Sequence, residues 1–486
     1  VLDTTAVSTF TNFAKGAELW TVVAPGTAVL SVDAAGGYKP MSGTSMAAPM
    51  VSGAAALVQQ AFPWFTGKQI ADAILTTANN NFQAPEYALT LDLSQPGNRV
   101  VISYIDKDAP ALSKEEVKAL VISHYEASRA SWENRKITLD YLLDLVDQGN
   151  FATESVSREE VFGQGILDVD KAVKGIARLD ANRLTARNIE ALDELRTGRK
   201  DALEVFDTQG YLAEFSNDIS QRQWDNKYHH PDYQTGGIKG EDADALAGKN
   251  IGLRKTGDGM LILSGTNSYE GATVVDGGIL AIAQRADGTG GVLQNSDVLV
   301  RAGGALMGDG TIQQTLVNNG IVIPGFAGDT LTVHNYVQNK EGSLVITFDE
   351  QSHNALKVDS AQLAGNLLFM PEQGKFYRNS FSLSINNLLQ VTDAAPANLR
   401  ADAGTAQNNA SQSGGISGEF DKILAEDVSP TLHVTLENYN PANFSGTVHL
   451  QRNQDAYSQF AGNAGAASVG GALYDLVNEA RGDMQQ

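Results

Sequence analysis

A run of small and apolar residues between Ser45 and Gln60 constrains the fold more than any other feature of this sequence. Most of its positions are Ala, Met, Val or Leu, so it predicts a helix that is apolar around its whole circumference. Such a helix is buried on all sides in a folded domain and needs a layer of structure on each face. Two short apolar runs before it, at residues 19–24 and 29–32, predict strands.

The residues that lead into this helix carry a possible chemistry. Gly43 and Thr44 place Ser45 at the N-terminus of the helix, beside unpaired backbone N–H groups and the positive end of the helix dipole. The same N–H groups can stabilise an oxyanion after the hydroxyl has attacked a carbonyl. Pro49 is expected in the first turn, where its missing N–H costs nothing. For an arbitrary serine, simple capping of the helix is the far commoner role.

Three segments resemble one peptidase family. Residues 42–53 read SGTSMAAPMVSG, Ala24-Pro25-Gly26 precedes them, and residues 163–168 read GQGILD before a helix expected over 169–176. Together they resemble subtilisin-like serine peptidases, or subtilases. The resemblance implies a partial α/β subtilisin-like domain at residues 1–178, a parallel sheet with a central buried helix, in which Ser45 is the catalytic nucleophile.

The partners that this family gives its serine do not precede Ser45 here. The resemblance implies an upstream Asp and His, yet all seven histidines follow Ser45, and Asp3 and Asp33 lack the family's sequence context. Residue 1 is Val. We therefore expect a processed or cut chain that lacks the upstream Asp and His and a C-terminal barrel. We also predict that residues 1–486 alone do not hydrolyse peptides.

The composition changes abruptly near residue 100. Residues 1–100 contain 10 charged side chains and residues 101–200 contain 33. This indicates a charged insertion at about 97–160, with a helix that begins after Ser113. Residues 179–245 combine a polar helical stretch over 188–200 with a loop rich in Asn, Gln, His and Gly, and we interpret them as a linker.

From about residue 250 the sequence consists of short apolar runs punctuated by glycine. The runs predict strands at 260–263, 273–275, 279–282, 298–300 and 321–323. Their spacing fits one coil of a parallel β-solenoid, although composition alone leaves a barrel or a sandwich open. Residues 253–282 resemble the passenger repeat of autotransporters, and 304–325 resemble the coils that follow it. We therefore predict an all-β right-handed parallel β-helix passenger at 246–395.

The remaining segments fit the same resemblance. Residues 396–418 are a low-complexity linker, and 419–486 hold the last strands and a helical tail that leads towards an absent barrel. Autotransporters carry an outer-membrane translocation barrel in the same polypeptide. The resemblance thus implies a secreted or cell-surface protein at the outer membrane of a Gram-negative bacterium, with polypeptide substrates.

Composition excludes several other functions. The net charge of −22 disfavours nucleic acid as a partner. The absence of cysteine removes disulfides, zinc ribbons and iron–sulfur clusters. His229-His230 and residues 286–291 are better explained as loop and turn than as metal ligands. We expect no cofactor and no metal site, while the family resemblance leaves calcium open.

Two hypotheses follow from different classes of protein. The leading one is a serine-type endopeptidase of a secreted subtilisin-like autotransporter, incomplete in this chain, that acts through an acyl-enzyme on Ser45. The alternative is a non-catalytic β-helical passenger or adhesin-like surface module with a vestigial peptidase remnant. An α/β-hydrolase is disfavoured because Ser45 lacks the Gly-x-Ser-x-Gly context.

Overall fold

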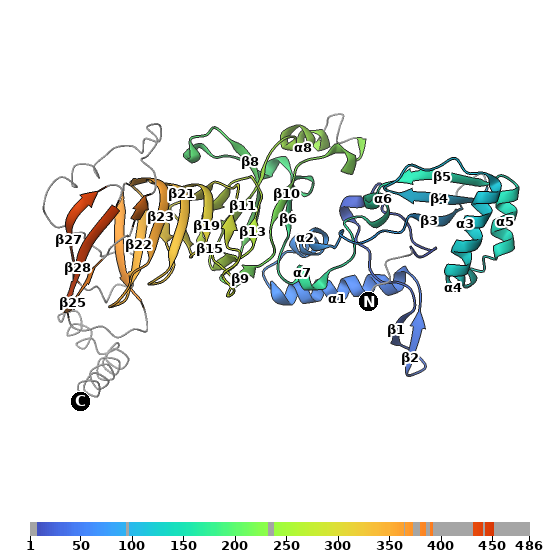
Figure 1. Cartoon of the computed structure of the whole chain (residues 1–486), viewed down its shortest axis with the longest axis horizontal. Coiled ribbons are helices and arrows are strands. Elements are labelled where there is room, and N and C mark those ends of the chain that lie inside the picture. The colour runs from blue at the N-terminus through green and yellow to red at the C-terminus, as the bar shows by residue number, and fades with distance from the viewer. Residues whose placement is uncertain are drawn as a thin grey trace. The chain divides into compact units, whose positions relative to one another are not determined.

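The computed structural model divides the chain into two compact units (Figure 1). Unit 1 comprises residues 1–190 and 214–251, and unit 2 comprises 191–213 and 252–486. The structure describes residues 7–93, 97–231, 238–363, 365–372, 380–384, 389–391, 431–440 and 443–451. The low-complexity linker at 396–418 and the helical tail of the sequence prediction lie outside these described residues.

Unit 1 contains the apolar helix, α1 (Thr44–Ala61), which packs against α2 (Gly67–Thr77) and α7 (Val169–Ala172). Helix α2 begins with a capping box. Thr66 Oγ1 accepts from the Gln69 N–H at 3.3 Å, and Gln69 Oε1 accepts from the Thr66 N–H at 2.9 Å. Two orphan donors of the helix start are thereby satisfied.

Helix α1 is not buried on all sides, so that prediction is wrong for the described structure. Only Ala54 and Val58 are buried, and 48% of the Leu57 surface is exposed. The described elements cover the side of α1 that bears Ala54 and Val58, and they leave the remainder of an apolar helix open. An apolar helix surface of this kind is usually covered by another layer.

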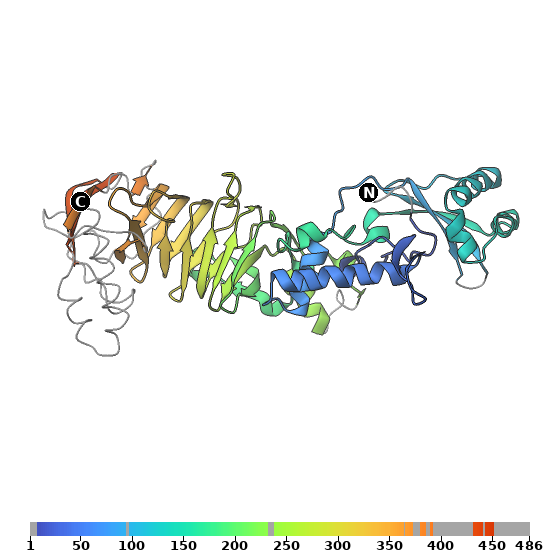
Figure 2. The same ribbon diagram turned by 90° about the horizontal axis from the view of Figure 1, so that it is seen from below.

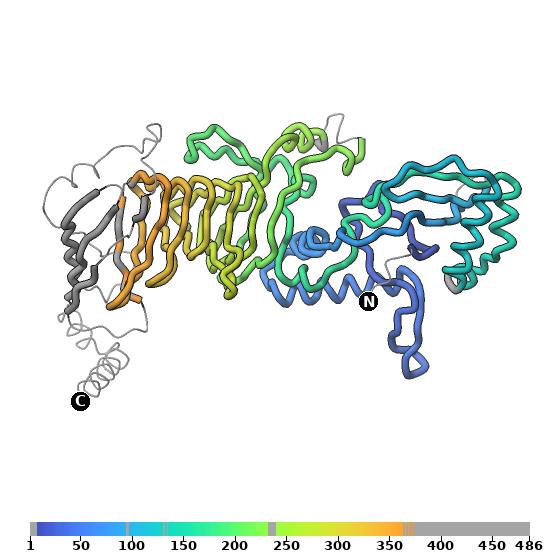
Figure 3. Tube along the Cα trace, in the orientation of Figure 1, coloured from blue at the N-terminus to red at the C-terminus, as the bar shows by residue number. Residues whose placement is uncertain are grey.

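The strands expected before α1 form only in part, and they do not make a parallel sheet around it. Strand β1 (Val29–Val32) pairs with β2 (Tyr38–Met41) as an antiparallel hairpin whose residues are largely exposed, visible as the blue loop in Figure 3. Residues 19–24 contain η1 (Glu18–Trp20) and a single parallel bridge from Val23 to Ile166. The conformation at these positions depends on pairing with distant residues, which a local sequence pattern does not indicate.

A compact α/β module fills the region of the charged insertion. Its sheet has the order β3 (Tyr87–Asp92), β4 (Arg99–Ile105), β5 (Phe151–Val156), with β4 antiparallel to β3 and parallel to β5. Between β4 and β5 the chain forms α3 (Lys114–Ala127), α4 (Arg129–Asn134) and α5 (Leu139–Asp147). Ser113 and Glu116 form the expected capping box of α3.

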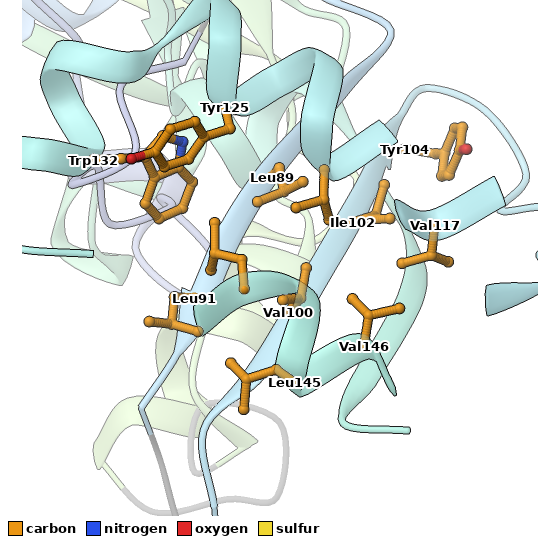
Figure 4. Close-up of a cluster of buried hydrophobic side chains, with 12 residues drawn as sticks. Leu89, Leu91, Val100, Ile102, Tyr104, Val117, Tyr125, Trp132, Leu145 and Val146 are labelled. Carbon is orange, nitrogen blue, oxygen red and sulfur yellow. The ribbon is translucent and has the colours of Figure 1, made fainter. Parts of the chain in front are cut away.

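The helices α3 to α5 cover one face of this sheet with a well-buried core (Figure 4). Leu89, Val100 and Ile102 from the strands meet Val117 and Leu142 from the helices. Trp132 is also fully buried in this cluster. The insertion therefore has a hydrophobic core of its own and is more than a charged surface loop.

Two segments of unit 1, one before and one after residues 191–213 of unit 2, pack together. Strand β10 (Ser220–Arg222) pairs in parallel with β6 (Arg178–Asp180), and α8 (Ile238–Leu246) follows. Phe215 is fully buried against Phe62, Trp64 and Phe65. The segment at 179–245, interpreted as a linker, thus contributes to a packed core.

The helix expected over residues 188–200 is wrong. This stretch contains β7 (Ile189–Ala191) and η4 (Asp193–Leu195) before β8 (Lys200–Asp207). Leu192 and Leu195 are buried in one cluster with Val274 and other apolar residues of unit 2. Burial of these two leucines against the strands outweighs the helix propensity of this stretch.

Most strands of unit 2 are parallel and alternate between two sheets (Figure 2). One sheet follows the order β8, β11 (Ile251–Thr256), β14 (Thr273–Val275), β17 (Val298–Val300), β19 (Thr311–Asn318), β21 (Thr330–Gln338), β23 (Ala355–Leu363) and β26 (Leu389–Val391). The other follows β12 (Met260–Leu263), β15 (Gly278–Ile282), β18 (Gly304–Met307), β20 (Ile321–Ile323), β22 (Ser343–Phe348) and β24 (Asn366–Pro371). The five strands predicted from the sequence are confirmed.

Two further features complete the described chain. The last described strands are antiparallel: β28 (Asn443–Gln451) pairs with β25 (Ser380–Ser384) and β27 (Thr431–Asn440). Within the described ranges, none of the helices combines the length and the apolar character needed to cross a bilayer.

Candidate active site around Ser45

Ser45 lies in the first turn of α1 and is exposed. Gly43 is the N-cap residue, and neither Thr44 nor Ser45 caps the helix with its side chain. The Met46 N–H donates to the Gly43 carbonyl at 3.0 Å. The N–H groups of Thr44 and Ser45 precede it in the first turn, where a helix offers no acceptor of its own. The capping explanation for Ser45 is therefore wrong.

A tight backbone contact holds the loop before Ser45. The Gly43 N–H donates to the Gly26 carbonyl at 2.7 Å. A Cβ on Gly26 would lie 3.0 Å from the Gly43 carbonyl oxygen, and Gly43 itself has φ of +152°. Both positions consequently favour glycine. The Ala24-Pro25-Gly26 segment is thereby connected directly to the start of α1.

Ser42 has a role that the sequence prediction missed. Its Oγ accepts a hydrogen bond from the Ala28 N–H at 2.9 Å, and Ala28 has a positive φ of 52°. The hydroxyl thus fixes the strained turn that leads from Gly26 into the hairpin. A serine directly before Gly43 was the only signal in the sequence.

The segment at 163–168 lies beside the residues that precede this loop. Leu167 N–H donates to Val23 O at 2.8 Å, and Val23 N–H donates to Gly165 O at 2.9 Å. A Cβ on Gly165, whose φ is +124°, would lie 2.5 Å from the Asn79 carbonyl oxygen. Asp168 caps α7 by accepting from the Lys171 N–H at 3.1 Å. The motif therefore joins the loop before Ser45 to the end of α2.

Pro49 lies deeper in the helix than expected. It is the sixth residue of α1, so its ring nitrogen stands where an N–H would donate to the Ser45 carbonyl. The expectation that it falls in the first turn is wrong. The Ser45 carbonyl lacks that intrahelical donor as a result.

Ser45 makes no side-chain hydrogen bond with any residue that the structure describes. Histidines with described side-chain contacts lie elsewhere in the fold: His124 faces Trp132, His229 stacks on Trp224, His334 binds Asp359, and His353 Nδ1 contacts the Asn354 carbonyl. Burial lowers the pKa of His124 below its ordinary value and favours its neutral form. Across the described ranges, the serine is brought together with neither a base nor an orienting carboxylate.

No metal site accompanies Ser45. Within the described ranges, no group of three or more His, Asp or Glu side chains is arranged to hold a metal ion. Asp287 in the turn at 286–291 accepts from the N–H and Oγ1 of Thr289, at 2.9 and 2.6 Å. That carboxylate is engaged within its own turn, as in an Asx turn.

Comparison with known protein families fits this geometry. The model of the subtilase family matches residues 2–92, which include Ser45, the Gly43 loop and α2. A second model, the passenger-associated transport repeat, matches residues 253–282 in unit 2. The two matches confirm the resemblance to a subtilisin-like autotransporter.

Individual relatives match this chain over short stretches. Alkaline elastase YaB from Bacillus sp. (strain YaB) is 41% identical over 73 residues, which are 15% of this chain and 18% of the relative. Subtilisin DY from Bacillus licheniformis is 43% identical over 65 residues, 13% of this chain and 23% of the relative. Subtilisin-like protease SBT2.3 from Arabidopsis thaliana is 52% identical over 50 residues, 10% of this chain and 6% of the relative. The chain thus spans less than a quarter of the relatives it matches.

Proposed function

We propose that the whole protein is a serine endopeptidase in which Ser45 is the nucleophile. The observation that carries the proposal is an exposed serine hydroxyl in the first turn of an apolar helix, in a loop held by Gly26 and Gly43. In this role Ser45 Oγ attacks the scissile carbonyl carbon, the leaving amine departs with a proton, and water then hydrolyses the acyl-enzyme.

The start of α1 supplies the electrostatic part of this chemistry. Thr44 and Ser45 present N–H groups without an intrahelical acceptor, at the positive end of the helix dipole. A negative oxygen that develops on the attacked carbonyl is stabilised there at no cost of reorganisation. A single donor of this kind contributes about 100- to 1000-fold to kcat.

The general base and its orienting carboxylate come, in this proposal, from polypeptide outside residues 1–486. Ser45 has no described side-chain partner, and the apolar surface of α1 is open although such a helix is usually covered. A layer that covers α1 would bring the missing side chains to Ser45. Both observations favour a site that additional chain completes.

Unit 2 and the passenger repeat suggest how the enzyme reaches its substrates. We propose that the parallel strands of unit 2 form a right-handed β-helix passenger, carried through the outer membrane of a Gram-negative bacterium by a barrel of the same polypeptide. Support comes from the two parallel sheets and from the repeat at residues 253–282. The substrates are then polypeptides at or beyond the cell surface.

Peptide hydrolysis by the whole protein, with and without Ser45, tests the proposal. Ser45→Ala should lower kcat by about 10⁴-fold or more, because the nucleophile is lost. Ser52→Ala is the matched control, since Ser52 is an exposed serine in the same helix and its Oγ donates only to the Ala48 carbonyl, at 3.2 Å. Equal activity of the two variants would refute the role of Ser45.

The alternative, a non-catalytic surface module with a peptidase remnant, makes the opposite prediction. It expects the whole protein to lack peptidase activity that depends on Ser45. The missing base among the described residues is the observation in its favour. Hydrolysis that is lost in Ser45→Ala and kept in Ser52→Ala would exclude it.

A further inference from the structure

A small polar cavity lies in unit 1, away from Ser45. It has a volume of about 90 Å³ and is lined by polar side chains from four segments: Asn80, Arg158, Glu159, Gln164 and Arg222. Phe82 and Phe162 form an apolar part of its wall and meet edge to face with ring centroids 5.0 Å apart. Because one water takes about 30 Å³, the cavity holds about three waters or one group of the size of acetate.

Arg158, in the first turn of α6 (Arg158–Phe162), is fixed by hydrogen bonds through Nε and Nη1 and lies over the Phe82 ring, 5.2 Å from its centroid. Its Nε donates to Asp106 Oδ2 at 3.2 Å, and its Nη1 donates to the carbonyls of Asn80 and Phe82, both at 2.9 Å. Its Nη2 donates to no described residue. The guanidinium is thus held rigidly while one of its N–H₂ groups stays available.

Arg222 lines the cavity beside a second buried guanidinium, that of Arg178. Both donate to Gln164 Oε1, at 2.8 and 2.6 Å. Both also face one carboxylate, Asp180, at 3.5 and 3.8 Å, which is longer than a charge-assisted hydrogen bond. Arg222 Nη1 and Arg178 Nε are buried and have no acceptor among the described residues.

Charges of both signs surround the cavity and balance. Burial and repulsion by the neighbouring Arg222 lower the pKa of Arg178 to about 10. Asp106 and Asp180 face guanidiniums, while Glu159 accepts from Tyr228 Oη at 2.8 Å and from Lys227 at 3.1 Å. The cations Arg158, Arg178, Arg222 and Lys227 are matched by Asp106, Asp180, Glu159 and Asp225, which faces Lys227 at 3.8 Å, and Glu160 with Lys15 adds one charge of each sign.

We propose that this cavity binds one carboxylate group, anchored by Arg158 and Arg222 with the exposed Asn80 amide as a third donor. Arg158 and Arg222 each keep guanidinium N–H groups without an acceptor among the described residues, a planar carboxylate matches the fork of a guanidinium, and the volume admits a group of that size. The carboxylate belongs either to a small free acid or to the C-terminus of a peptide. The proposal is independent of the role of Ser45.

Acetate binding to the chain of residues 1–486 tests this site, with calorimetric titration at a constant concentration of chloride. Asn80→Asp places a negative charge at the rim of the cavity and leaves the carbonyl that binds Arg158 in place. Asn81→Asp is the matched control, because it makes the same change one residue along, at an exposed position that does not line the cavity. We expect saturable acetate binding that Asn80→Asp weakens by about tenfold or more and Asn81→Asp leaves unchanged.

Two peptides that differ only at the C-terminus distinguish the sources of the carboxylate. Tighter binding of the free-acid peptide than of both its amide and acetate assigns the cavity to a chain end. Binding of acetate without gain from the peptide assigns it to small free acids. No saturable acetate binding, or equal weakening by Asn80→Asp and Asn81→Asp, would overturn the proposal.

Discussion

Phe215 provides the sharpest test of how unit 1 is completed. It lies in residues 214–251, which belong to unit 1 and follow residues 191–213 of unit 2. Its ring is fully buried against Phe62, Trp64 and Phe65, at centroid distances of 5.5, 6.1 and 5.9 Å. Phe215→Ala removes the ring from this cluster and leaves a cavity. The loss of a buried phenylalanine destabilises a protein by about 3 to 5 kcal/mol.

Urea unfolding followed by tryptophan fluorescence measures this loss in the intact chain. All four tryptophans, Trp20, Trp64, Trp132 and Trp224, belong to unit 1, so the signal reports unit 1 alone. For a unit of this size m is about 3 kcal/mol/M, and the midpoint should fall by about 1 to 1.7 M. The control is Phe326→Ala in unit 2, where 63% of the side chain surface is exposed.

A midpoint shift below about 0.3 M for Phe215→Ala would refute the reasoning, since it corresponds to about 1 kcal/mol. The same conclusion would follow if Phe326→Ala lowered the midpoint equally. Either result would mean that residues 214–251 are not part of the cooperative core of unit 1.

Two further predictions concern backbone space and proton binding. Gly165→Ala should destabilise unit 1 by about 2 kcal/mol or more, because the new Cβ would lie 2.5 Å from Asn79 O at a φ of +124°. Gly53→Ala, in open space on α1, should instead stabilise by about 0.5 to 1 kcal/mol in the same urea assay; the reverse order would contradict the geometry. Burial lowers the pKa of His124 below 6.5, so the unfolded chain takes up the proton first, and stability should fall as pH drops below about 6.5. The pH dependence of the free energy of unfolding that comes from His124 is at most about 1.4 kcal/mol per pH unit and should be absent in His124→Gln. Urea midpoints of both proteins from pH 7.5 to 5 measure it. An equal slope in the two proteins would contradict the prediction.

Local sequence signals predicted the parts of this fold that local interactions decide. The helix that begins after Ser113 was predicted because Glu116 follows three positions along and closes a capping box with it. The strands of unit 2 were predicted because glycines bound each short apolar run. The position of Ser45 at the start of α1 was predicted from the residues around it.

Features that depend on distant partners escaped prediction. The open surface of α1 could not be read from its residues, because an apolar pattern reports what a helix needs and not what covers it. The supposed helix at 188–200 failed because Leu192 and Leu195 are buried against strands far along the chain. Phe215 looked like part of a linker since its aromatic partners lie some 150 residues earlier.

Labelling with a fluorophosphonate probe, which reacts with activated serines, tests the central claim most directly. The probe would be applied in parallel to the whole protein from its native source and to residues 1–486, with the labelled residue identified by mass spectrometry. The account predicts that Ser45 is labelled in the whole protein and not in residues 1–486, since the proposal places the general base outside this sequence. Labelling of a different serine, or no labelling of Ser45 in the whole protein, would contradict it.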